Sequence, residues 1–590
     1  MCGICGELRL DQNLADLAVT AKMMEKLRPR GPDHAGSYSD GALSFGHRRL
    51  SIIDLSTKSN QPMIDTELGL SLVFNGTIYN YPELREELKR KGHHFVSNGD
   101  TEVILKAYRE WGVDCPRYLD GMFAFAIWDM RHKTLFMARD RFGIKPFYWT
   151  RNSRFFRFAS NPQALLAGGE VNTEIDSEAL HFQFSLHGVV PAPLTILKGI
   201  RKLAPAHWML IHQNGKVDQQ AYWELTAQRP NQAKSEAEWI SEIGQVLKQA
   251  VSKRNKIADV PVGVLLSGGL DSSLLVALLA ELGLPEIKTF SIGFEDQPEE
   301  QGNEFEFSDQ VVERYQTQHQ KYLIANDAVL KRLPNAIEMM AEPMFGQDAV
   351  AFYLLSEQVS QQIKVVQSGQ GADEVFGGYF WYYKMLKEKQ GSRLTRFQKY
   401  YFDRDHAEFK NMIETPYLTQ DVTADYISKA LDKAGADSFM DAVLRLDCTT
   451  LIVDDPVKRV DNMTMAWGLE ARVPFLDHHL VELASACPPE IKFKETGKYI
   501  LKQIARGIVP DAIIDRPKGY FPMPALKYVR GEFLTMMQDT LNSQKAKERG
   551  LYQSAYIDRL LAAPEMHHTR IQGSKLWHLA LLEQWLQTHL

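Results

Sequence analysis

A glycine-rich turn near the middle of the chain carries residues that could bind a phosphate group. Residues 259–273, DVPVGVLLSGGLDSS, join a short β-branched apolar run to a Ser-Gly-Gly turn and then to a helix-forming run. A strand, a glycine turn and a helix start form an anion site, because free N–H groups and the helix dipole face the same point. The turn lacks the Gly-Lys-Ser/Thr of a Walker A loop. We therefore expect the turn to hold a pyrophosphate group, and Asp271 to bind a Mg²⁺ ion together with it. A bound pyrophosphate indicates that ATP is cleaved between its α- and β-phosphates.

The alternative for this turn is a buried strand–helix connection with no ligand, which a lone Ser-Gly-Gly would not exclude. The full string SGGLDSS at 267–273 is more demanding. It resembles the pyrophosphate loop of the ATP pyrophosphatases, and this resemblance favours a nucleotide role.

A second candidate for chemistry stands at the start of the chain. Cys2 follows Met1 directly and precedes Gly3, a small-residue context in which the initiator methionine is readily removed. Removal would put a thiol and a free α-amine on one residue. Because an α-amine titrates near pH ~8, it could act as the base for its own side chain. On these residues alone two alternatives stay open: a Cys2–Cys5 redox or metal pair, and a cysteine without a role.

The residues that follow bear on this choice. Six motifs occur in order: RGPD at 30–33, HRRLSIID at 47–54, FNGTIYN at 74–80, GDTE at 99–102, GMFAFA at 121–126 and ARDRFGIKP at 138–146. Together they resemble the class II glutamine amidotransferase domain, which favours the N-terminal nucleophile over the redox pair.

The resemblance implies roles in the hydrolysis of glutamine. Cys2 would attack the side-chain amide, and the Asn75 side chain with the Gly76 backbone would stabilise the oxyanion that forms. Arg49 would pair with the α-carboxylate of glutamine, and Asp100 would hold its α-ammonium. The remaining predicted glutamine contacts are Leu50, Ser51, Ile52, Ile53 and Thr77. Thr77 is a departure, because asparagine synthetases usually carry Glu after Asn-Gly; Asp100 would then have to supply more of the charge.

The nucleotide site is predicted from two neighbouring strands of an open α/β sheet, whose ligands lie off the carboxyl ends of the strands. Runs at 288–294 and 364–367 predict further parallel strands, and the second leads into SGQGADEVFGGY at 368–379. Asp271 and Asp373 would share the metal, and for either one alone a helix cap is the alternative. The predicted ATP contacts are Leu266, Ser267, Gly268, Gly269, Asp271, Ser272, Ile292, Ser368 and Gly369.

Motifs in the last third extend the resemblance. The strings DDPVKRVDNMTMA at 454–466, EARVPFLD at 470–477 and GKYILK at 497–502 resemble asparagine synthetases and β-lactam synthetases. Lys498 lies at the family's catalytic lysine, where a cation would neutralise charge on the acyl-adenylate transition state. Arg472 and Asp477 are interpreted as structural, in an internal ion pair. Glu304 and Glu306, in the acidic segment 295–307, are not expected to bind metal.

The identity of the amidated acid is predicted from one departure. Asparagine synthetases read Ser-Gly-Glu-Gly where this chain has Gln370, which carries no charge at neutral pH. An amide in place of a carboxylate favours an acid without a nearby α-amine, such as an N-blocked peptide. This loop, with HGVVPAP at 187–193, FDRDHAE at 402–408 and RPKGYFP at 516–522, resembles the N-acetylglutaminylglutamine amidotransferase family. Aspartate, the acceptor of an asparagine synthetase, is the alternative.

Elements of two kinds must position these residues. Alternating apolar runs at 70–74, 123–127, 134–138 and 155–159 predict strands, and short helices between them suggest an αββα sandwich of the N-terminal-nucleophile type. The second half predicts a parallel α/β domain like that of the ATP pyrophosphatases. We place a glutaminase domain at 1–215 and a synthetase domain at 230–590, joined through the polar stretch 224–238. Free ammonia would need an enclosed apolar passage between them.

Composition limits the remaining alternatives. The length of 590 residues and the 44% hydrophobic content predict at least two globular domains. The net charge of −6 gives no basic surface for nucleic acid, so we expect small-molecule substrates and no nucleic-acid partner. No apolar run reaches a membrane span, and five scattered cysteines fit a reducing cytoplasm. Three possibilities stay open: that the chain forms a homodimer, that it is a synthetase that uses only free ammonia, and that it is a non-catalytic protein that retains the fold.

Overall fold

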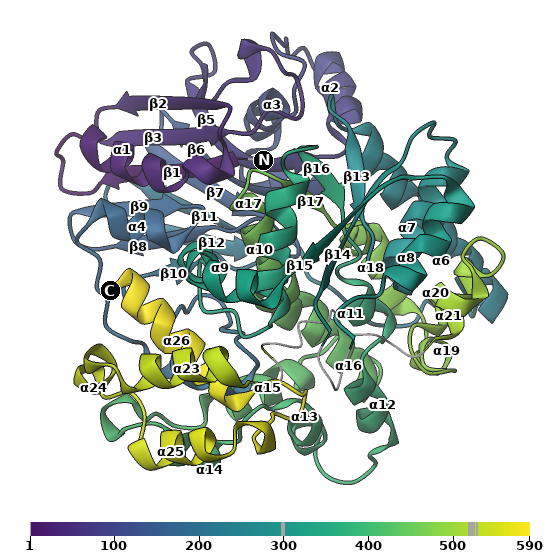
Figure 1. The fold of residues 1–590 in the computed structure, drawn as a ribbon. Coiled ribbons are helices and arrows are strands. Elements are labelled where there is room, and N and C mark those ends of the chain that lie inside the picture. The colour runs from purple at the N-terminus through teal and green to yellow at the C-terminus, as the bar shows by residue number, and fades with distance from the viewer. Residues whose placement is uncertain (1, 297–300, 517–525, 527–528) are drawn as a thin grey trace.

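The fold was analysed in a computed structural model that describes residues 2–296, 301–516, 526 and 529–590. Its N-terminal half contains two six-stranded antiparallel sheets that lie face to face (Figure 1). One has the strand order β10-β8-β9-β1-β3-β2 and the other the order β12-β11-β7-β6-β5-β4. The first sheet contains β1 (Cys2–Arg9), β2 (His34–Asp40), β3 (Leu43–Arg49), β8 (Tyr148–Arg151), β9 (Phe155–Ala159) and β10 (Arg201–Lys202). The second contains β4 (Met63–Asp65), β5 (Leu70–Ile78), β6 (Gly121–Asp129), β7 (Thr134–Arg139), β11 (His207–His212) and β12 (Val217–Ala221).

Strand β6 shows why two sheets stack here. Side chains of a strand alternate between its faces, and in β6 both faces are apolar. Phe123, Phe125 and Ile127 enter the core under the helices, whereas Ala124 and Ala126 enter the core between the sheets. The outer faces are covered by α1 (Leu17–Lys26) with α4 (Pro162–Gly168), and by α2 (Tyr81–Arg90) with α3 (Thr101–Trp111). The predicted αββα sandwich is confirmed.

A third sheet forms the centre of the C-terminal half, in the order β15-β14-β13-β16-β17, and all of its pairings are parallel. Its strands are β13 (Val262–Leu265), β14 (Lys288–Phe294), β15 (Gln318–Ile324), β16 (Val365–Gln367) and β17 (Glu470–Arg472). The chain leaves β13 toward β14 on one side and returns to β16 on the other. The strand order therefore reverses between β13 and β16, the place where open α/β sheets bind ligands. The predicted parallel α/β class is confirmed.

Helices cover both faces of this sheet. They include α6 (Glu236–Lys256), α7 (Leu270–Glu281), α8 (Phe305–Tyr315), α9 (Asn326–Met339), α10 (Asp348–Val359), α17 (Lys458–Met465), α18 (His478–Ala486) and α20 (Tyr499–Ala505). The sequence LDSSLLVALLAE of α7 is buried from Ser272 to Leu279, which fits a helix packed on all sides.

A helical layer formed by two separate stretches of the chain packs below the sheet in Figure 1. Its helices are α12 (Phe380–Lys387), α13 (Arg393–Tyr401), α14 (His406–Met412), α15 (Val422–Asp432), α16 (Phe439–Leu446), α23 (Gly531–Asn542), α24 (Gln544–Arg549), α25 (Ser554–Ala562) and α26 (Lys575–His589). His181 of α5 (Ser177–Ser185) is hydrogen-bonded to His406, and His187 to Asp403. Two of the strings that resemble the dipeptide amidotransferases therefore meet here; of the third, RPKGYFP, only Arg516 lies within the described residues.

The predicted boundaries at 215 and 230 stay predictions. The second sheet runs to Ala221, and the capping box of α6 begins at Ser235. Within the described residues, no helix is both long and apolar enough to cross a bilayer.

Candidate active sites

Cys2 begins β1 at the point where the two halves of the molecule meet. Its side chain is buried, and burial raises the pKa of the thiol. The backbone nitrogen of Cys2 donates to Oδ1 of Asn75 at 3.0 Å. If Met1, which lies outside the described residues, is removed, this nitrogen becomes the α-amine. The amine would then be oriented by Asn75 and held beside its own thiol.

Asn75 and Gly76 lie in β5, opposite β6. The Asn75 side chain is fully buried, and its Nδ2 has no hydrogen-bond partner within the described part of the chain. A buried amide donor without a partner carries a desolvation penalty, which an incoming oxyanion would relieve. At Gly76 a Cβ would lie 2.2 Å from the backbone oxygen of Met122, so only glycine fits. The two predicted oxyanion residues therefore lie beside Cys2. One of them, Asn75, has a side-chain donor without a partner in the described part of the chain.

A pocket opens beside Cys2. Its lining residues are Cys2, Arg49, Leu50, Ile52, Ile53, Ser59, Gln61, Phe74, Gly76, Thr77, Asp100 and Thr101. Most of the predicted glutamine contacts are among them, whereas Ser51 and Asn75 are not. Four lining residues were not predicted: Ser59, Gln61, Phe74 and Thr101. Phe74 and Thr101 belong to motifs already recognised, but nothing in the sequence singles out Ser59 or Gln61.

Arg49 contributes to this pocket in a way that its residue type does not predict. Its Nη1 donates to Ser56 O at 2.9 Å and to Asn60 Oδ1 at 2.7 Å, and its Nη2 donates to the carbonyls of Ile53 and Asp54. The guanidinium therefore closes the loop that forms one wall of the pocket. A carboxylate bound by Arg49 would have to share or replace these carbonyl contacts.

Asp100 is the acidic group of the pocket. Its Oδ2 accepts from the Ile78 N–H at 3.0 Å, and burial raises the pKa of the carboxyl to about 6. A desolvated carboxylate of this kind gains most from a cationic ligand, because the cation offsets the loss of water. Its position fits an ammonium site.

The second predicted site lies at the carboxyl ends of β13 and β16. Ser267 Oγ accepts from the Gly269 N–H at 3.3 Å and lies 3.1 Å from Ser272 Oγ, so hydroxyls organise the turn before α7. Gly268 has a φ of +76°, which favours glycine. At Gly369 a Cβ would lie 3.0 Å from the Cβ of Asp271, so the two glycine loops, which include Ser368, are in contact.

Leu266 and Ile292 are the predicted ATP contacts whose backbone groups would flank the adenine, and those of Leu266 already form hydrogen bonds within the protein. The N–H of Leu266 donates to Phe290 O at 2.8 Å, and the Ser291 hydroxyl donates to Leu266 O. Ile292 is buried within β14. An adenine base bound here could donate a hydrogen bond to the second lone pair of the Leu266 carbonyl oxygen. It could also contact the side chains of Ser291 and Ile292.

Lys498 lies between the two predicted metal ligands. Its Nζ is 2.5 Å from Asp271 Oδ2 and 3.0 Å from Asp373 Oδ1. Burial alone would lower the pKa of Lys498, but the two carboxylates raise it above its usual range. A Cβ at Gly378 would lie 1.9 Å from Asp373 Oδ1, so glycine allows the chain to pass close to the cluster. Three predicted residues, far apart in the sequence, therefore form one charged site.

The donor set of this cluster fits Mg²⁺. Two carboxylates face one position, and hard divalent cations prefer oxygen ligands of this kind. The ammonium of Lys498 now bridges the same two carboxylates, which shows that they can share a cation. Glu304, not expected to bind metal, forms an ion pair with Arg516 at 3.0 Å. Of the acidic segment 295–307, residues 297–300 lie outside the described part of the chain.

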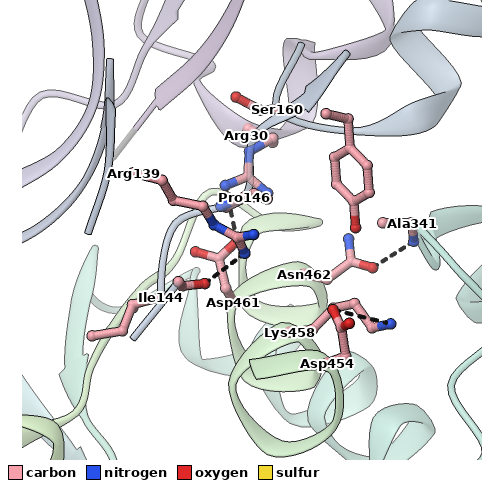
Figure 2. A pocket seen from close by; sticks show the side chains of 12 residues that line it. Arg30, Arg139, Ile144, Pro146, Ser160, Ala341, Asp454, Lys458, Asp461 and Asn462 are labelled. Atoms are coloured by element: carbon pink, nitrogen blue, oxygen red, sulfur yellow. Dashed lines mark hydrogen bonds and ion pairs between the residues drawn. The ribbon is translucent and has the colours of Figure 1, made fainter. Parts of the chain in front are cut away.

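A second, small cavity lies between the two halves (Figure 2). Charged and apolar residues share its walls: Asp461 accepts from Arg30 at 3.0 Å, and Asp454 and Lys458 lie below. The apolar part is formed by Ile144, Pro146 and Ala341. None of its lining residues comes from 121–126 or 463–467, two segments whose apolar content makes them candidate walls of the predicted ammonia passage. The path of ammonia stays a prediction.

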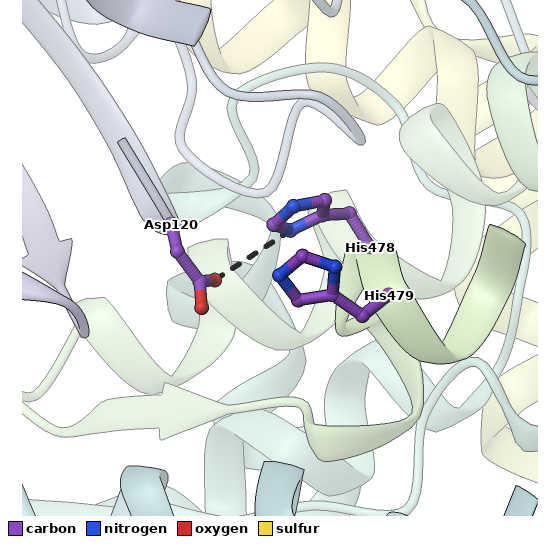
Figure 3. Close-up of side chains that lie close together, drawn as sticks. All are labelled: Asp120, His478 and His479. Atoms are coloured by element: carbon purple, nitrogen blue, oxygen red, sulfur yellow. Dashed lines mark ion pairs between the residues drawn. The ribbon is translucent and has the colours of Figure 1, made fainter. Parts of the chain in front are cut away.

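Another cross-half contact joins Asp120 to His478, with His479 beside it (Figure 3). Lys253 also donates to Asp120, at 2.5 Å. Because this lysine already neutralises the carboxylate, the group needs no metal ion to be stable.

The expected pairing of Arg472 with Asp477 needs correction, and the Cys2–Cys5 alternative can be compared with the structure. Arg472 and Asp477 are both buried, but they do not pair with each other. Arg472 pairs with Glu470 at 2.5 Å, two residues earlier on the same face of β17, and Asp477 pairs with Arg254 at 2.8 Å. Cys2 and Cys5, three apart on a strand, point to opposite faces, and the cysteines are all unpaired in the described chain.

The class of protein follows from these two sites and from comparison with known families. Residues 1–223 match the family of glutamine amidotransferase domains, and residues 242–587 match the asparagine synthase family. The chain belongs to the asparagine synthase family, with a class II glutamine amidotransferase domain at its N-terminal end. It is accordingly an ATP-dependent amidoligase that takes its nitrogen from glutamine and forms AMP and pyrophosphate.

Similar proteins span the same length. The chain is 31% identical to glutamine-hydrolysing asparagine synthetase 1 of Bacillus subtilis, over 99% of this chain and 96% of the relative. It is 29% identical to asparagine synthetase 3 of the same organism, over 100% and 99%. A putative asparagine synthetase of Mycobacterium tuberculosis is 32% identical over 96% and 93%.

Proposed function

We propose that this enzyme amidates the terminal carboxylate of an N-blocked peptide, with N-acetylglutaminylglutamine as the substrate that the sequence favours. The observation that carries the proposal is Gln370. It lies in the loop after β16, between Gly369, which contacts Asp271, and Gly371. A neutral amide here provides no carboxylate for the ammonium of an amino-acid acceptor, whereas it can donate to and accept from a peptide group.

In the glutaminase half, we assign Cys2 as the nucleophile and its α-amine as the base. The thiol attacks the side-chain amide of glutamine, the proton passes to the amine, and the Asn75 side chain with the Gly76 N–H holds the oxyanion. Ammonia leaves as the thioester forms, and water then releases glutamate. The unpartnered Nδ2 of Asn75 supports this assignment.

In the synthetase half, we assign Lys498 to charge neutralisation. The acceptor carboxylate attacks the α-phosphate of ATP, and pyrophosphate leaves toward the Ser267–Gly269 turn. Asp271 and Asp373 would hold Mg²⁺, which would screen the phosphate charge when bound. Lys498 would then be displaced toward the acyl-phosphate oxygens, where its positive charge stabilises the transition state. Ammonia displaces AMP from the acyl-adenylate.

Aspartate is the second candidate acceptor, and one observation favours it. The two Bacillus subtilis relatives that match along nearly the whole chain are named asparagine synthetases. The two acceptors differ at the α-carbon, where aspartate carries a free ammonium and the blocked peptide does not.

One experiment separates the two candidates. The purified full chain is incubated with ATP, Mg²⁺ and glutamine, with aspartate or N-acetylglutaminylglutamine as the acceptor, and AMP is measured. We expect AMP with the dipeptide only. AMP with aspartate alone would overturn the acceptor assignment, and AMP with neither would overturn both candidates. Amide formation from ammonium chloride at equal rates in the wild-type chain and in Cys2→Ala, with none from glutamine, would show instead a synthetase that uses free ammonia.

A further inference from the structure

A buried carboxylate of the synthetase half contacts the wall of the glutamine pocket. Glu470, the first residue of β17, is fully buried, and its Oε1 lies 3.4 Å from the Thr77 hydroxyl. Thr77 lines the pocket beside Cys2. The two residues are 393 positions apart in the chain. A residue of the synthetase half therefore contacts one of the residues that line the pocket, although it does not line the pocket itself.

Glu470 is held in place and held ionised. Arg472 donates to its Oε1 at 2.5 Å and is itself fixed by the carbonyls of Arg254 and Ile257, at 2.7 and 2.8 Å. Burial would raise the pKa of Glu470, but Arg472 lowers it. The negative charge therefore persists at neutral pH, and it raises the pKa of Asp100 in addition to the larger effect of burial.

The contact fixes what the Thr77 hydroxyl can do. A hydroxyl has one proton to donate and two lone pairs to accept with. A carboxylate can only accept, so the Thr77 proton is directed to Glu470 and its lone pairs remain for the pocket. The Thr77 hydroxyl oxygen thus faces, as a hydrogen-bond acceptor, the pocket that Asp100 also lines. The negative charge of Glu470 makes this oxygen a stronger acceptor.

We propose that Glu470 is a positioning residue of the glutamine site: through Thr77 it supplies, from the synthetase half, the second negative group that binds the α-ammonium of glutamine. The inference rests on the proposed glutaminase function of the Cys2 pocket. It accounts for a threonine at a position where the family usually carries a glutamate, because an acidic group across the interface acts on the pocket through the Thr77 hydroxyl. It also implies that a fully formed glutamine site requires the two halves to be docked.

The test compares variants on either side of the contact. Glu470→Gln keeps the shape and removes the charge, whereas Thr77→Val removes the hydroxyl and leaves the Glu470–Arg472 pair intact. Glutamate release from glutamine is measured with the full chain, ATP, Mg²⁺ and acceptor, and KM is separated from kcat. We expect each variant to raise the KM for glutamine about tenfold with little change in kcat, as loss of a charge-assisted contact would. The double variant should be no worse than either single one, because both break the same contact.

Rescue and control variants separate this role from a structural one. Thr77→Glu in the Glu470→Gln background should return the KM to near the wild-type value, because it restores an acidic group in the pocket. Glu342→Gln is the matched control. Glu342 is also buried between the halves and contacts Tyr148 and Lys202, at 3.0 and 3.2 Å, but it does not line the glutamine pocket. It should leave the KM for glutamine unchanged.

The outcomes are distinct. An unchanged KM in Thr77→Val, or a fall in kcat without a rise in KM in both single variants, would overturn the inference. A rise in KM that Thr77→Glu does not reverse would also overturn it. If the wild-type chain releases no glutamate from glutamine but forms the amide from ammonium chloride, the proposed glutaminase function fails instead.

Discussion

At the scale of single residues, the two sites use buried charge in opposite ways. Asp100 is a carboxylate that burial destabilises, so it gains from a cationic ligand. Lys498 is a cation that two carboxylates stabilise, so its charge persists where an anion will form. The first arrangement favours binding and the second favours stabilisation of a transition state.

The raised pKa of Asp100 predicts how glutamine binding responds to pH. Its ionised form binds the ammonium, so protonation below its pKa of about 6 weakens binding. We expect the KM for glutamine to rise by about tenfold per pH unit below that value, because one proton competes with one ligand charge. Initial rates of glutamate release between pH 5 and pH 8 would measure it. In Asp100→Asn the KM should be high and independent of pH over this range, and a flat profile in the wild-type chain would contradict the assignment.

The same group predicts an effect on stability. Because the pKa of Asp100 in the folded chain lies above the ordinary value of 3.8, the folded chain binds the extra proton in the window between them. Stability therefore falls as pH rises through this window, and the ionised carboxylate destabilises the empty site above pH about 6. We expect Asp100→Asn to raise the midpoint of thermal unfolding at pH 7.5 while weakening glutamine binding. A lowered midpoint would show that the carboxylate stabilises the fold through contacts other than those described.

Lys498 predicts a loss confined to the activation step. In Lys498→Met the carboxylates of Asp271 and Asp373 would face each other without the cation that now joins them. We expect acceptor-dependent pyrophosphate release to fall by about 10²–10³-fold, the usual effect of removing one preorganised electrostatic contact. Lys498→Arg should recover only part of it, since a planar guanidinium cannot occupy the position of an ammonium. Undiminished pyrophosphate release in the Met variant would exclude the assigned role.

At the scale of elements, the parallel sheet joins the two sites. Its strands present their carboxyl ends to the nucleotide loops and their amino ends to the glutamine pocket. Asp259, just before β13, accepts from the Asp54 N–H at 2.7 Å and donates its own N–H to Ile52 O at 2.9 Å. Lys364, before β16, pairs with Asp33 at 2.7 Å. With β13 spanning about 13 Å for its four residues, the two sites are connected by short, stiff strands.

This arrangement predicts an effect of a residue that touches neither substrate. Asp259→Ala removes the acceptor of Asp54 N–H and loosens the loop that carries Ile52 and Ile53 in the pocket wall. We expect the KM for glutamine to rise about fivefold, in line with the loss of a charge-assisted hydrogen bond, and Asp259→Asn, which keeps an acceptor, to show less. Steady-state glutamate release gives both values. An equal rise of the KM for glutamine in Asp259→Ala and Asp259→Asn would mean that the charge of Asp259, and not its hydrogen bond, positions the loop.

The sequence predicts these elements unevenly, for physical reasons. Strands β14 and β16 are short apolar runs, and the predicted runs at 288–294 and 364–367 match their limits to within a residue. Strand β12, VDQQA, is a polar edge strand with no apolar pattern, and β17 has only three residues. The Glu470–Arg472 pair was detectable, because residues two apart on a strand share a face. The carbonyl contacts of Arg49 were not, because they depend on a loop conformation that includes Asp54 at a φ of +47°.

At the scale of the whole molecule, buried ion pairs join the halves. Asp461 of α17 accepts from Arg30 and Lys145, all three nearly fully buried, and Nε of Arg30 donates to the Cys2 carbonyl at 3.3 Å. Lys202 likewise reaches Asp454, at 2.6 Å. Desolvated pairs of this kind are fixed in geometry, so they orient the halves more than they stabilise them. The nucleophile is thus connected through one arginine to a helix of the synthetase half.

This connection predicts that Asp461 couples glutamine hydrolysis to amide formation. Asp461→Ala leaves Arg30 and Lys145 as buried cations without their partner, which should destabilise the chain by about 3–5 kcal/mol. It should also loosen the contact of the synthetase half with Cys2, so more glutamate would be released per AMP formed. Glu174→Gln, which breaks the exposed pair with Lys198, is the control and should leave stability nearly unchanged, because water screens the pair. The test measures the unfolding midpoint and the glutamate-to-AMP ratio on the same preparations. If Asp461→Ala is destabilised but keeps the wild-type ratio, the contacts of Asp461 with Arg30 and Lys145 stabilise the interface without coupling the two reactions.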